Sequence, residues 1–206
     1  ASEFCGGNGV VKLAFADTPG LPATETASPD QTGMTTVDVW AVLDEVDRVE
    51  GPGGVMLAIG GFELTLDVQG AEPIILEKEI LLPYRDFGQS QAECRVGTHP
   101  GQPFTDGRLA LVRWRVGFQG EVSDVVFDLA PGGAASCATL EGCPGSGCRA
   151  LYAGTVESRQ EGFLFGAGSR PAVLNPTGEP DLAVSPCTVG WREAGVFGEP
   201  IERRDR

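Results

Sequence analysis

Two stretches of this 206-residue chain alternate apolar and polar side chains with a period of two, and this alternation most constrains the fold. The first stretch, Gly61–Val68, places all its large apolar side chains at every second position. Such alternation is typical of a β-strand with one buried face, because successive side chains of a strand point to opposite sides. The apolar side is Phe62, Leu64, Leu66 and Val68, and the polar side is Glu63, Thr65 and Asp67.

The second alternating stretch runs from Arg108 to Phe118 and continues after a turn at Gln119–Glu121. Beyond the turn, the apolar residues Val125, Phe127 and Leu129 keep the same period. Two alternating strands joined by a short polar turn are typical of a β-hairpin. The pattern therefore predicts a hairpin, with the face of Arg113 and Arg115 exposed and the opposite face buried; the predicted buried residues of its first strand are Val112, Trp114, Val116 and Phe118.

Further short apolar segments bring the expected number of strands to about ten. Thr35–Leu43 is apolar on both faces, as in a central strand. Pro73–Pro83 favours a strand, with a short helix as the alternative. With 30 glycines and 15 prolines along the chain, tight turns fit better than long helices. We expect an all-β fold, a two-sheet antiparallel β-sandwich or jelly roll. The other expected strands are 9–16, 151–157, 162–165, 172–174 and 184–197.

No internal repeat or compositional break divides the chain, so residues 1–206 are expected to form a single domain. Asp17–Gly33 contains three prolines and is expected to be a loop or linker after an N-terminal strand. Residues 203–206, which include Arg203, Arg204 and Arg206, are expected to be a solvated polar tail.

The formal net charge of −14 excludes two classes of partner. A surface this negative repels phosphate backbones and anionic lipid headgroups, so we expect no nucleic-acid partner. No run of about 18 apolar residues occurs, so we expect no membrane insertion.

Six cysteines are scattered along the chain in mostly Gly-rich, turn-like surroundings. Their spacing does not form zinc knuckles, and the chain has one histidine, His99. We expect three disulfides, hence an oxidising setting and a secreted, extracellular or cell-surface protein. The pairing stays open among 15 connectivities. The cysteines are Cys5, Cys94, Cys137, Cys143, Cys148 and Cys187.

Motifs for catalysis are absent: no nucleophile elbow, phosphate loop or dinucleotide fingerprint occurs. His99 lies in Gly97–Gly101, which is expected to be a surface turn. Carboxylate pairs could serve a polysaccharide hydrolase, but acids such as Glu63, Asp67 and Asp128 fall on the polar faces of strands. We expect no enzyme and no cofactor; Ser28–Gln31 and Glu179–Asp181 could offer oxygen ligands to a structural calcium ion.

Aromatic residues are few and divide into two groups. Trp40 and Trp114 lie within predicted strands and are expected in the core. Tyr84, Tyr152 and Trp191 are less constrained, and an exposed row of their rings would form a platform for stacking sugars. They are therefore the candidate residues for glycan binding.

Three segments resemble the cohesin-like β-sandwiches of secreted bacterial proteins. They are the early strand Thr36–Leu43, the core strand Gly60–Leu66, in which an aromatic-x-Leu pattern follows a Gly, and the later strand Val125–Leu129. The resemblance extends over about residues 8–176. In two respects the chain departs from the family: Leu66 is followed by Asp67–Val68 where cohesins have a Tyr-Asp pair, and cohesins are typically poor in cysteine. The resemblance implies a sandwich fold and a non-catalytic adhesion or assembly role.

These observations favour a structural or adhesive extracellular protein whose partner is another copy of itself or another extracellular protein. One version is self-assembly into a fibre or surface layer, with the N-terminal strand pairing with the open sheet edge of a neighbour. A carbohydrate-binding module is the alternative, and a polysaccharide hydrolase the second alternative. The expected assembly residues are Val10, Val11, Leu13 and Phe15.

Overall fold

The computed structural model describes residues 9–16, 24–29, 33–44, 50–51, 54–103, 107–130, 149–156, 159–185 and 191–193. All regular structure in these ranges is β, and no helix occurs in them, which confirms the all-β prediction. The strands are β1 (Val10–Phe15), β2 (Thr26–Ala27), β3 (Met34–Asp44), β4 (Glu50–Gly51), β5 (Gly54–Gln69), β6 (Ile74–Ile80), β7 (Tyr84–Asp86), β8 (Glu93–Pro103), β9 (Leu109–Gln119), β10 (Val125–Leu129), β11 (Ala150–Val156), β12 (Arg159–Arg170), β13 (Ala172–Leu174) and β14 (Trp191–Glu193).

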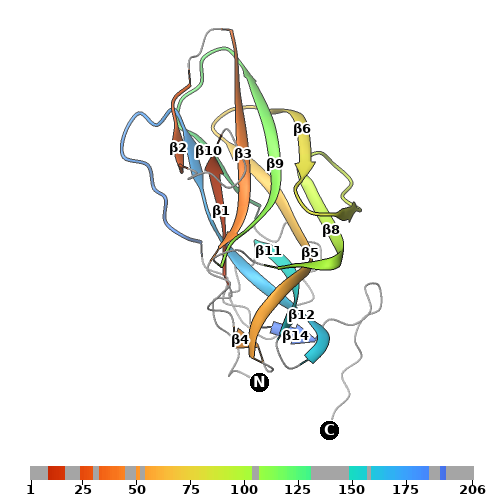
Figure 1. The fold of residues 1–206 in the computed structure, drawn as a ribbon. Helices are drawn as coiled ribbons and strands as arrows, with labels where there is room; N and C mark the ends of the chain where they lie inside the picture. The colour runs from red at the N-terminus through yellow and green to blue at the C-terminus, as the bar shows by residue number, and fades with distance from the viewer. Residues whose placement is uncertain are drawn as a thin grey trace.

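The strands form two packed layers, and in Figure 1 the layer that contains β3 and β9 faces the viewer. One layer has the order β1–β3–β9–β6, and the other is built around β5, which pairs with β8, β10 and β11. Strand β12 belongs to both layers, because its first part pairs with β11 and its last residues pair with β1. The predicted sandwich is confirmed, but it is not purely antiparallel: β1 pairs with β12, and β2 with β13, in parallel.

Alternation along the strands supplies the core between the layers. Trp114 and Phe118 of β9 are buried, as are Phe62 and Leu64 of β5. The burial of both alternating stretches is confirmed. Each fully buried large apolar side chain contributes about 1.5–3 kcal/mol relative to its exposed state, so these residues are a substantial part of what stabilises the contact between the layers.

The predicted hairpin of 108–118 with 125–129 is wrong. β9 pairs with β3 and β6, whereas β10 pairs with β5 and β13 in the other layer. Between them the chain crosses the sandwich, using positive φ at Gly120 (77°) and Asp124 (52°). Each of the two strands has one apolar face. In the sandwich these faces pack against each other across the core, so both are removed from water, whereas in a flat hairpin they would lie side by side on one surface.

The strand favoured for Pro73–Pro83 is confirmed as β6, in which a register shift between Ile75 and Glu77 makes Leu76 the extra residue of a bulge. Ile74 and Leu76 are therefore exposed, whereas Ile80 is buried. The prediction that Gly97–Gly101 is a surface turn is wrong, because these residues lie within β8, at a place where the register of β8 against β5 shifts. The predicted loop Asp17–Gly33 contains β2.

Candidate protein-binding site

The candidate site begins where β1 ends before its neighbour β3. The registered pairing stops at Phe15 opposite Val39, whereas β3 starts five residues earlier, at Met34. Phe15 remains in register with Val39, but its main-chain polar groups are directed away from β3: its N–H donates to the Thr24 carbonyl (2.8 Å) and its carbonyl accepts from the Thr24 N–H (3.1 Å). In the described part of the chain, no strand is registered against the start of β3 on this side.

The direction of each main-chain group of β3 follows from this contact. Hydrogen-bonding direction alternates along an antiparallel strand. The N–H and carbonyl of Phe15 are directed away from β3, so the main-chain groups of Trp40 are directed toward β1 and those of Val37 toward β9. The main-chain groups of Thr36 are directed again to the side where β1 has ended. Thr36 therefore presents its N–H and carbonyl at a stretch of sheet edge that is open as far as the described residues show; we call this stretch the open edge of β3.

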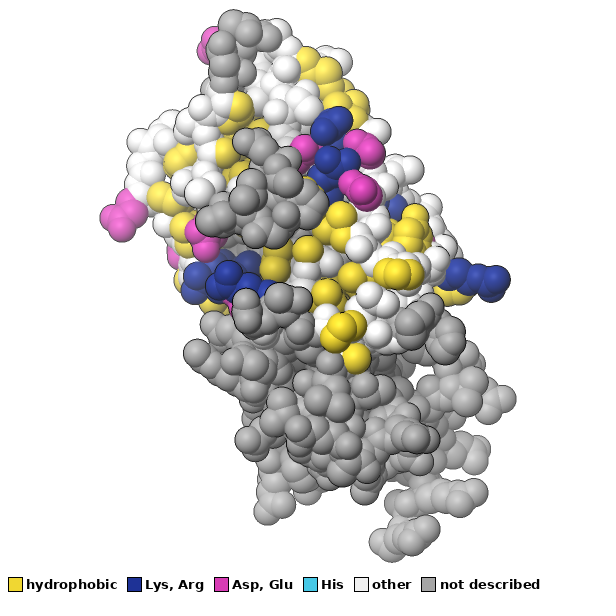
Figure 2. Space-filling model, in the orientation of Figure 1, with side chains coloured by type: hydrophobic (Ala, Val, Ile, Leu, Met, Phe, Trp, Pro, Cys, Tyr) yellow, Lys and Arg dark blue, Asp and Glu magenta, His cyan; other side chains and the backbone are white. Residues whose placement is uncertain are grey.

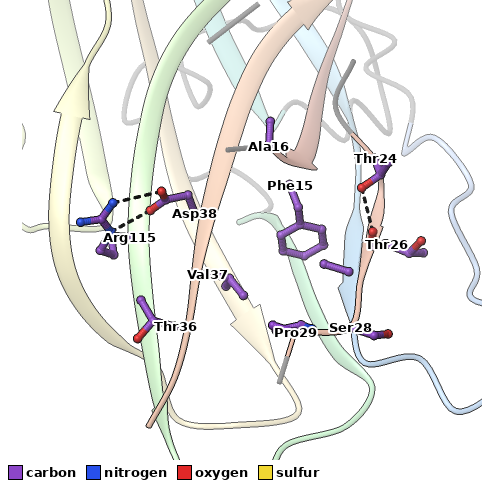
Figure 3. Close-up of a pocket in the computed structure, with 11 residues that line it drawn as sticks. Phe15, Ala16, Thr24, Thr26, Ser28, Pro29, Thr36, Val37, Asp38 and Arg115 are labelled. Carbon is purple, nitrogen blue, oxygen red and sulfur yellow. Dashed lines mark hydrogen bonds and ion pairs between the residues drawn. The ribbon is translucent and has the colours of Figure 1, made fainter. Parts of the chain in front are cut away.

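A pocket of about 680 Å³ lies beside this open stretch. Figure 3 shows Phe15 and Val37 pointing into the space between β3 and the segment Thr24–Pro29. Both side chains are only 8% exposed, and Phe15 packs edge to face on Phe127, with 5.6 Å between the ring centroids. The pocket therefore has a firm apolar floor.

Strand β2 and its neighbours form the other wall of the pocket. The Val173 N–H donates to the Glu25 carbonyl (2.8 Å), and the Asn175 N–H donates to the Ala27 carbonyl (2.7 Å). Thr24 donates its hydroxyl to the Thr26 carbonyl (2.8 Å). These bonds fix the wall to β13, so that the pocket is a preformed slot between two strands. We call it the β2–β3 slot: the open edge of β3 at Met34–Val37, with Phe15, Val37 and Ala27 beneath.

A cluster of charged side chains covers the outer face of the sheet next to the slot, visible in Figure 2 over β3, β9 and β6. Arg115 donates two hydrogen bonds to Asp38 (3.0 and 3.1 Å), and these raise the pKa of its guanidinium. Arg113 lies 2.7 Å from Glu79 and 3.7 Å from Asp38. The outer-face cluster is Asp38, Glu77, Glu79, Arg113 and Arg115, three carboxylates against two guanidinium groups.

Trp40 is buried, as expected, but it lies on the outer face of its layer and not in the cluster between the layers. Its register partner is Arg113, whose guanidinium carbon lies 5.9 Å from the centre of its ring. The indole N–H donates to the Ala16 carbonyl (2.7 Å), and the side chain is only 3% exposed. Trp40 thus supports the end of β1 from outside. Trp114 lies in the core as predicted.

The predicted assembly residues Val10, Val11, Leu13 and Phe15 do not lie at an open edge. β1 is paired with β3 on one side and with β12 on the other, so both of its edges are largely used within the chain. Its apolar side chains bury themselves in their own core, which satisfies them without a neighbour.

The end strand of the layer, β6, is also a poor edge for pairing. In the described part of the chain it pairs with β9 alone. Leu76 forms a bulge, and Lys78 turns inward, where its ammonium group binds Asp86 (2.7 Å) and the carbonyls of Ser90 and Glu93. Bulges and inward-pointing charges are the devices by which natural sheets block edge-to-edge pairing. The open stretch of β3 carries neither.

The three candidate glycan-stacking residues are not brought into one row. Tyr84 on β7 is 52% exposed and pairs with Thr98. Tyr152 is in register with Phe62 and Phe165, and Trp191 with Phe165; their side chains lie outside the described part of the structure. Sequence reasoning missed Phe87, which is 60% exposed.

Of the six cysteines, only Cys94 lies within the described residues. It is a free thiol on β8, 1% exposed, and burial raises its pKa to about 12. This differs from the expected disulfide, because Cys94 sits in the core within a strand and not in a surface turn. Cys5, Cys137, Cys143, Cys148 and Cys187 lie outside the described residues, so their disulfides stay a prediction.

The acids considered for hydrolysis are engaged in other contacts. Asp128 accepts hydrogen bonds from Ser169 (2.6 Å) and Arg149 (2.7 Å). Glu63 is buried, 3.6 Å from Arg95, and Asp67 accepts from Gln69 (2.8 Å). Within the described residues no group of three or more His, Cys, Asp and Glu side chains could hold a metal ion.

Comparison with known proteins gives similarity at the level of the fold. No family model matches the sequence, and no curated protein matches it. Among solved structures, the chain is similar to the seventh ScaB type I cohesin of Pseudobacteroides cellulosolvens, with 10% identity and a TM-score of 0.47 over 85% of this chain and 96% of that one.

Two further cohesins are similar to the chain. A cohesin module of a family 33 glycoside hydrolase from Clostridium perfringens has 10% identity and a TM-score of 0.42, over 83% of this chain and 99% of that one. CaCohA2 from Clostridium acetobutylicum has 8% identity and a TM-score of 0.37, over 85% and 96%. The resemblance stated from the sequence was to the same family. Within the described residues, no helix has the length and hydropathy needed to cross a membrane.

Proposed function

We propose that this protein is a non-catalytic extracellular binding module that holds another protein by adding an extended segment of it to β3. The observation that carries the proposal is the stretch of β3 at Thr36, beside the β2–β3 slot, against which no strand of the described residues is registered. An exposed strand edge gives affinity through main-chain hydrogen bonds, and a neighbouring pocket gives specificity through alternate side chains.

The geometry fits one added strand. A segment that runs antiparallel to β3, in line with β1, would pair with Thr36 and direct one side chain inward onto Val37 and Phe15. The floor and the wall of the slot are already in place, which lowers the entropic cost of binding.

Self-assembly into a fibre or surface layer is the version of this function in which the partner is another copy. Since β1 is paired on both sides and β6 carries a bulge, the assembly contact would use the β3 edge. The net charge of −14 opposes association of identical copies, which favours a different protein as the partner. Glycan binding is supported only by the exposed Tyr84 and is not the function we propose.

Selection of peptides on the immobilised full chain tests the proposal. A random-peptide display library is enriched on the wild-type protein, and the enriched peptides are then measured against Thr36→Pro and Thr36→Ala. Proline removes the N–H that would bond the added strand, whereas alanine keeps it. We expect binding to survive Thr36→Ala and to be lost in Thr36→Pro. Peptides that bind both variants equally would contradict strand addition at β3.

Amide hydrogen exchange provides a test that needs no variant. In the free protein the Thr36 amide should exchange much faster than that of its neighbour Val37, which is directed toward β9. On addition of an enriched peptide the Thr36 amide should become protected. Unchanged exchange at Thr36 in a saturated complex would show that the peptide binds elsewhere.

A further inference from the structure

The outer face beside the β2–β3 slot determines the charge of the segment that fits there. Cross-strand pairing places Glu77 of β6, Arg115 of β9 and Asp38 of β3 in one row, in which the charge alternates from strand to strand. Opposite charges in neighbouring register positions stabilise a sheet, and like charges destabilise it. On the far side of Asp38 the row reaches Ala16, which carries no charge and lines the pocket.

An added strand brings a side chain to this place. The residue that pairs with Thr36 points to the outer face, because Thr36 itself points there and paired residues share a face. From that position a long side chain reaches Asp38 diagonally, two residues further along β3. Its aliphatic part would lie over Thr36 and the exposed side chain of Met34, which is 46% exposed.

The charge of the outer-face cluster favours a cation at this position. Its three carboxylates are matched by two guanidinium groups, so one negative charge remains. The protein as a whole carries −14, which attracts cationic segments from a distance and repels anionic ones.

The inner face of the slot requires the opposite character. The next residue of the added segment would direct its side chain inward, between Val37, Phe15 and Ala27. A polar group there would find no hydrogen-bond partner among these three side chains, so an apolar one is favoured. We infer that the partner of this protein is an extended, basic segment in which lysine or arginine alternates with a small or β-branched apolar residue. This inference rests on the proposed function, because it specifies what is added to β3.

Three synthetic peptides with the same alternation test the inference on the full chain: acetylated and amidated TKVKVKT, TEVEVET and TSVSVST. Affinity is measured by NMR titration, with protection of the Thr36 amide as the sign of strand addition. We expect the basic peptide to protect Thr36 and to bind at least about tenfold more tightly than the acidic one. This preference should decrease as salt is added.

A matched pair of variants separates the local cluster from general attraction. Asp38→Asn and Glu121→Gln each remove one negative charge, but Glu121 is exposed in the turn after β9 and takes part in none of the ion pairs of the cluster. We expect Asp38→Asn to reduce the preference for the basic peptide severalfold and Glu121→Gln to leave it unchanged. Equal reductions in the two variants would overturn the assignment to this site.

The outcomes distinguish this inference from the proposed function. If the acidic or neutral peptide protects Thr36 as well as the basic one at equal affinity, the inferred charge is wrong and strand addition stands. If the basic peptide binds without protecting Thr36, or no peptide of the three binds, both the inferred partner and its docking on β3 are overturned.

Discussion

The rings of Phe118 and Phe127 meet edge to face, with 6.0 Å between their centroids. In the chain, only the short connection between β9 and β10 separates the two residues. Phe118 belongs to β9 and Phe127 to β10, so this contact joins the two layers of the sandwich. Phe127 also contacts Phe15, at the floor of the β2–β3 slot. The core and the candidate site therefore share one aromatic group.

Replacing Phe127 by alanine should lower the free energy of unfolding by about 3–5 kcal/mol, because it leaves a cavity between three rings. Urea denaturation followed by tryptophan fluorescence measures the change. Phe87→Ala is the matched control: its side chain is 60% exposed, and we expect a change of less than about 0.5 kcal/mol. A small loss in Phe127→Ala would contradict the packing of the two layers described above.

Asp128→Ala should destabilise the protein by about 3 kcal/mol, because the fully buried Ser169 loses the acceptor of its hydroxyl and Arg149 keeps only the Leu129 carbonyl. Asp67, the register partner of Asp128 on β5, serves as the control. It accepts one hydrogen bond, from Gln69, so Asp67→Ala should cost much less. Thermal melts of the two variants, made at the same pH, provide the comparison; equal melting temperatures would count against the Asp128 contacts.

Asp86 should make stability depend on acid pH. Burial raises its pKa, but hydrogen bonds from Lys78 and from the amides of Gly88 and Arg95 outweigh burial, and the pKa lies below its ordinary value of 3.8. A carboxyl with a lowered pKa in the folded state stabilises the protein above pH 3.8 and loses that contribution as the pH falls through the folded value. Asp86→Asn should therefore be less stable than wild type at neutral pH, with the gap narrowing below that point. Urea unfolding across this range measures the gap; a gap that widened in acid would contradict the assignment.

Cys94 should resist alkylation in the native protein, because its thiol is buried and its pKa is about 12. Iodoacetamide at mildly alkaline pH, followed by mass spectrometry of the Cys94 peptide, should show modification only after denaturation. Detection of Cys94 in a disulfide-linked peptide would contradict the free thiol. If Cys94 is free, five cysteines remain, so at most four can pair within one chain.

The strands could be predicted from sequence wherever one face is buried and the other is not, as in Gly61–Val68 and Arg108–Phe118. Pairing partners could not, because alternation records which face is buried and not which strand lies alongside. The hairpin error at Phe118 and Phe127 arose in this way. Trp40 shows a second limit: its place in an apolar run predicted the core, whereas the partner that shields its ring is Arg113 on the outer face.

The candidate site itself was beyond sequence analysis. It exists because β1 ends at Phe15 while β3 extends further, and the length of a strand relative to its neighbour leaves no local pattern. The alternation of charge from Glu77 through Arg115 to Asp38 runs across three strands, so it can be recognised only when their register is known.

The parallel pairing of Val10 with Gly168 has a consequence for synthesis of the chain. β1 is made before both of its neighbours, and β12 follows it only after most of the described strands. β1 and β3 can pair with each other as soon as both have been made, yet their sheet remains open on the side that β12 will occupy. Until β12 has been made, the apolar strand β1 therefore lacks one of its two neighbours.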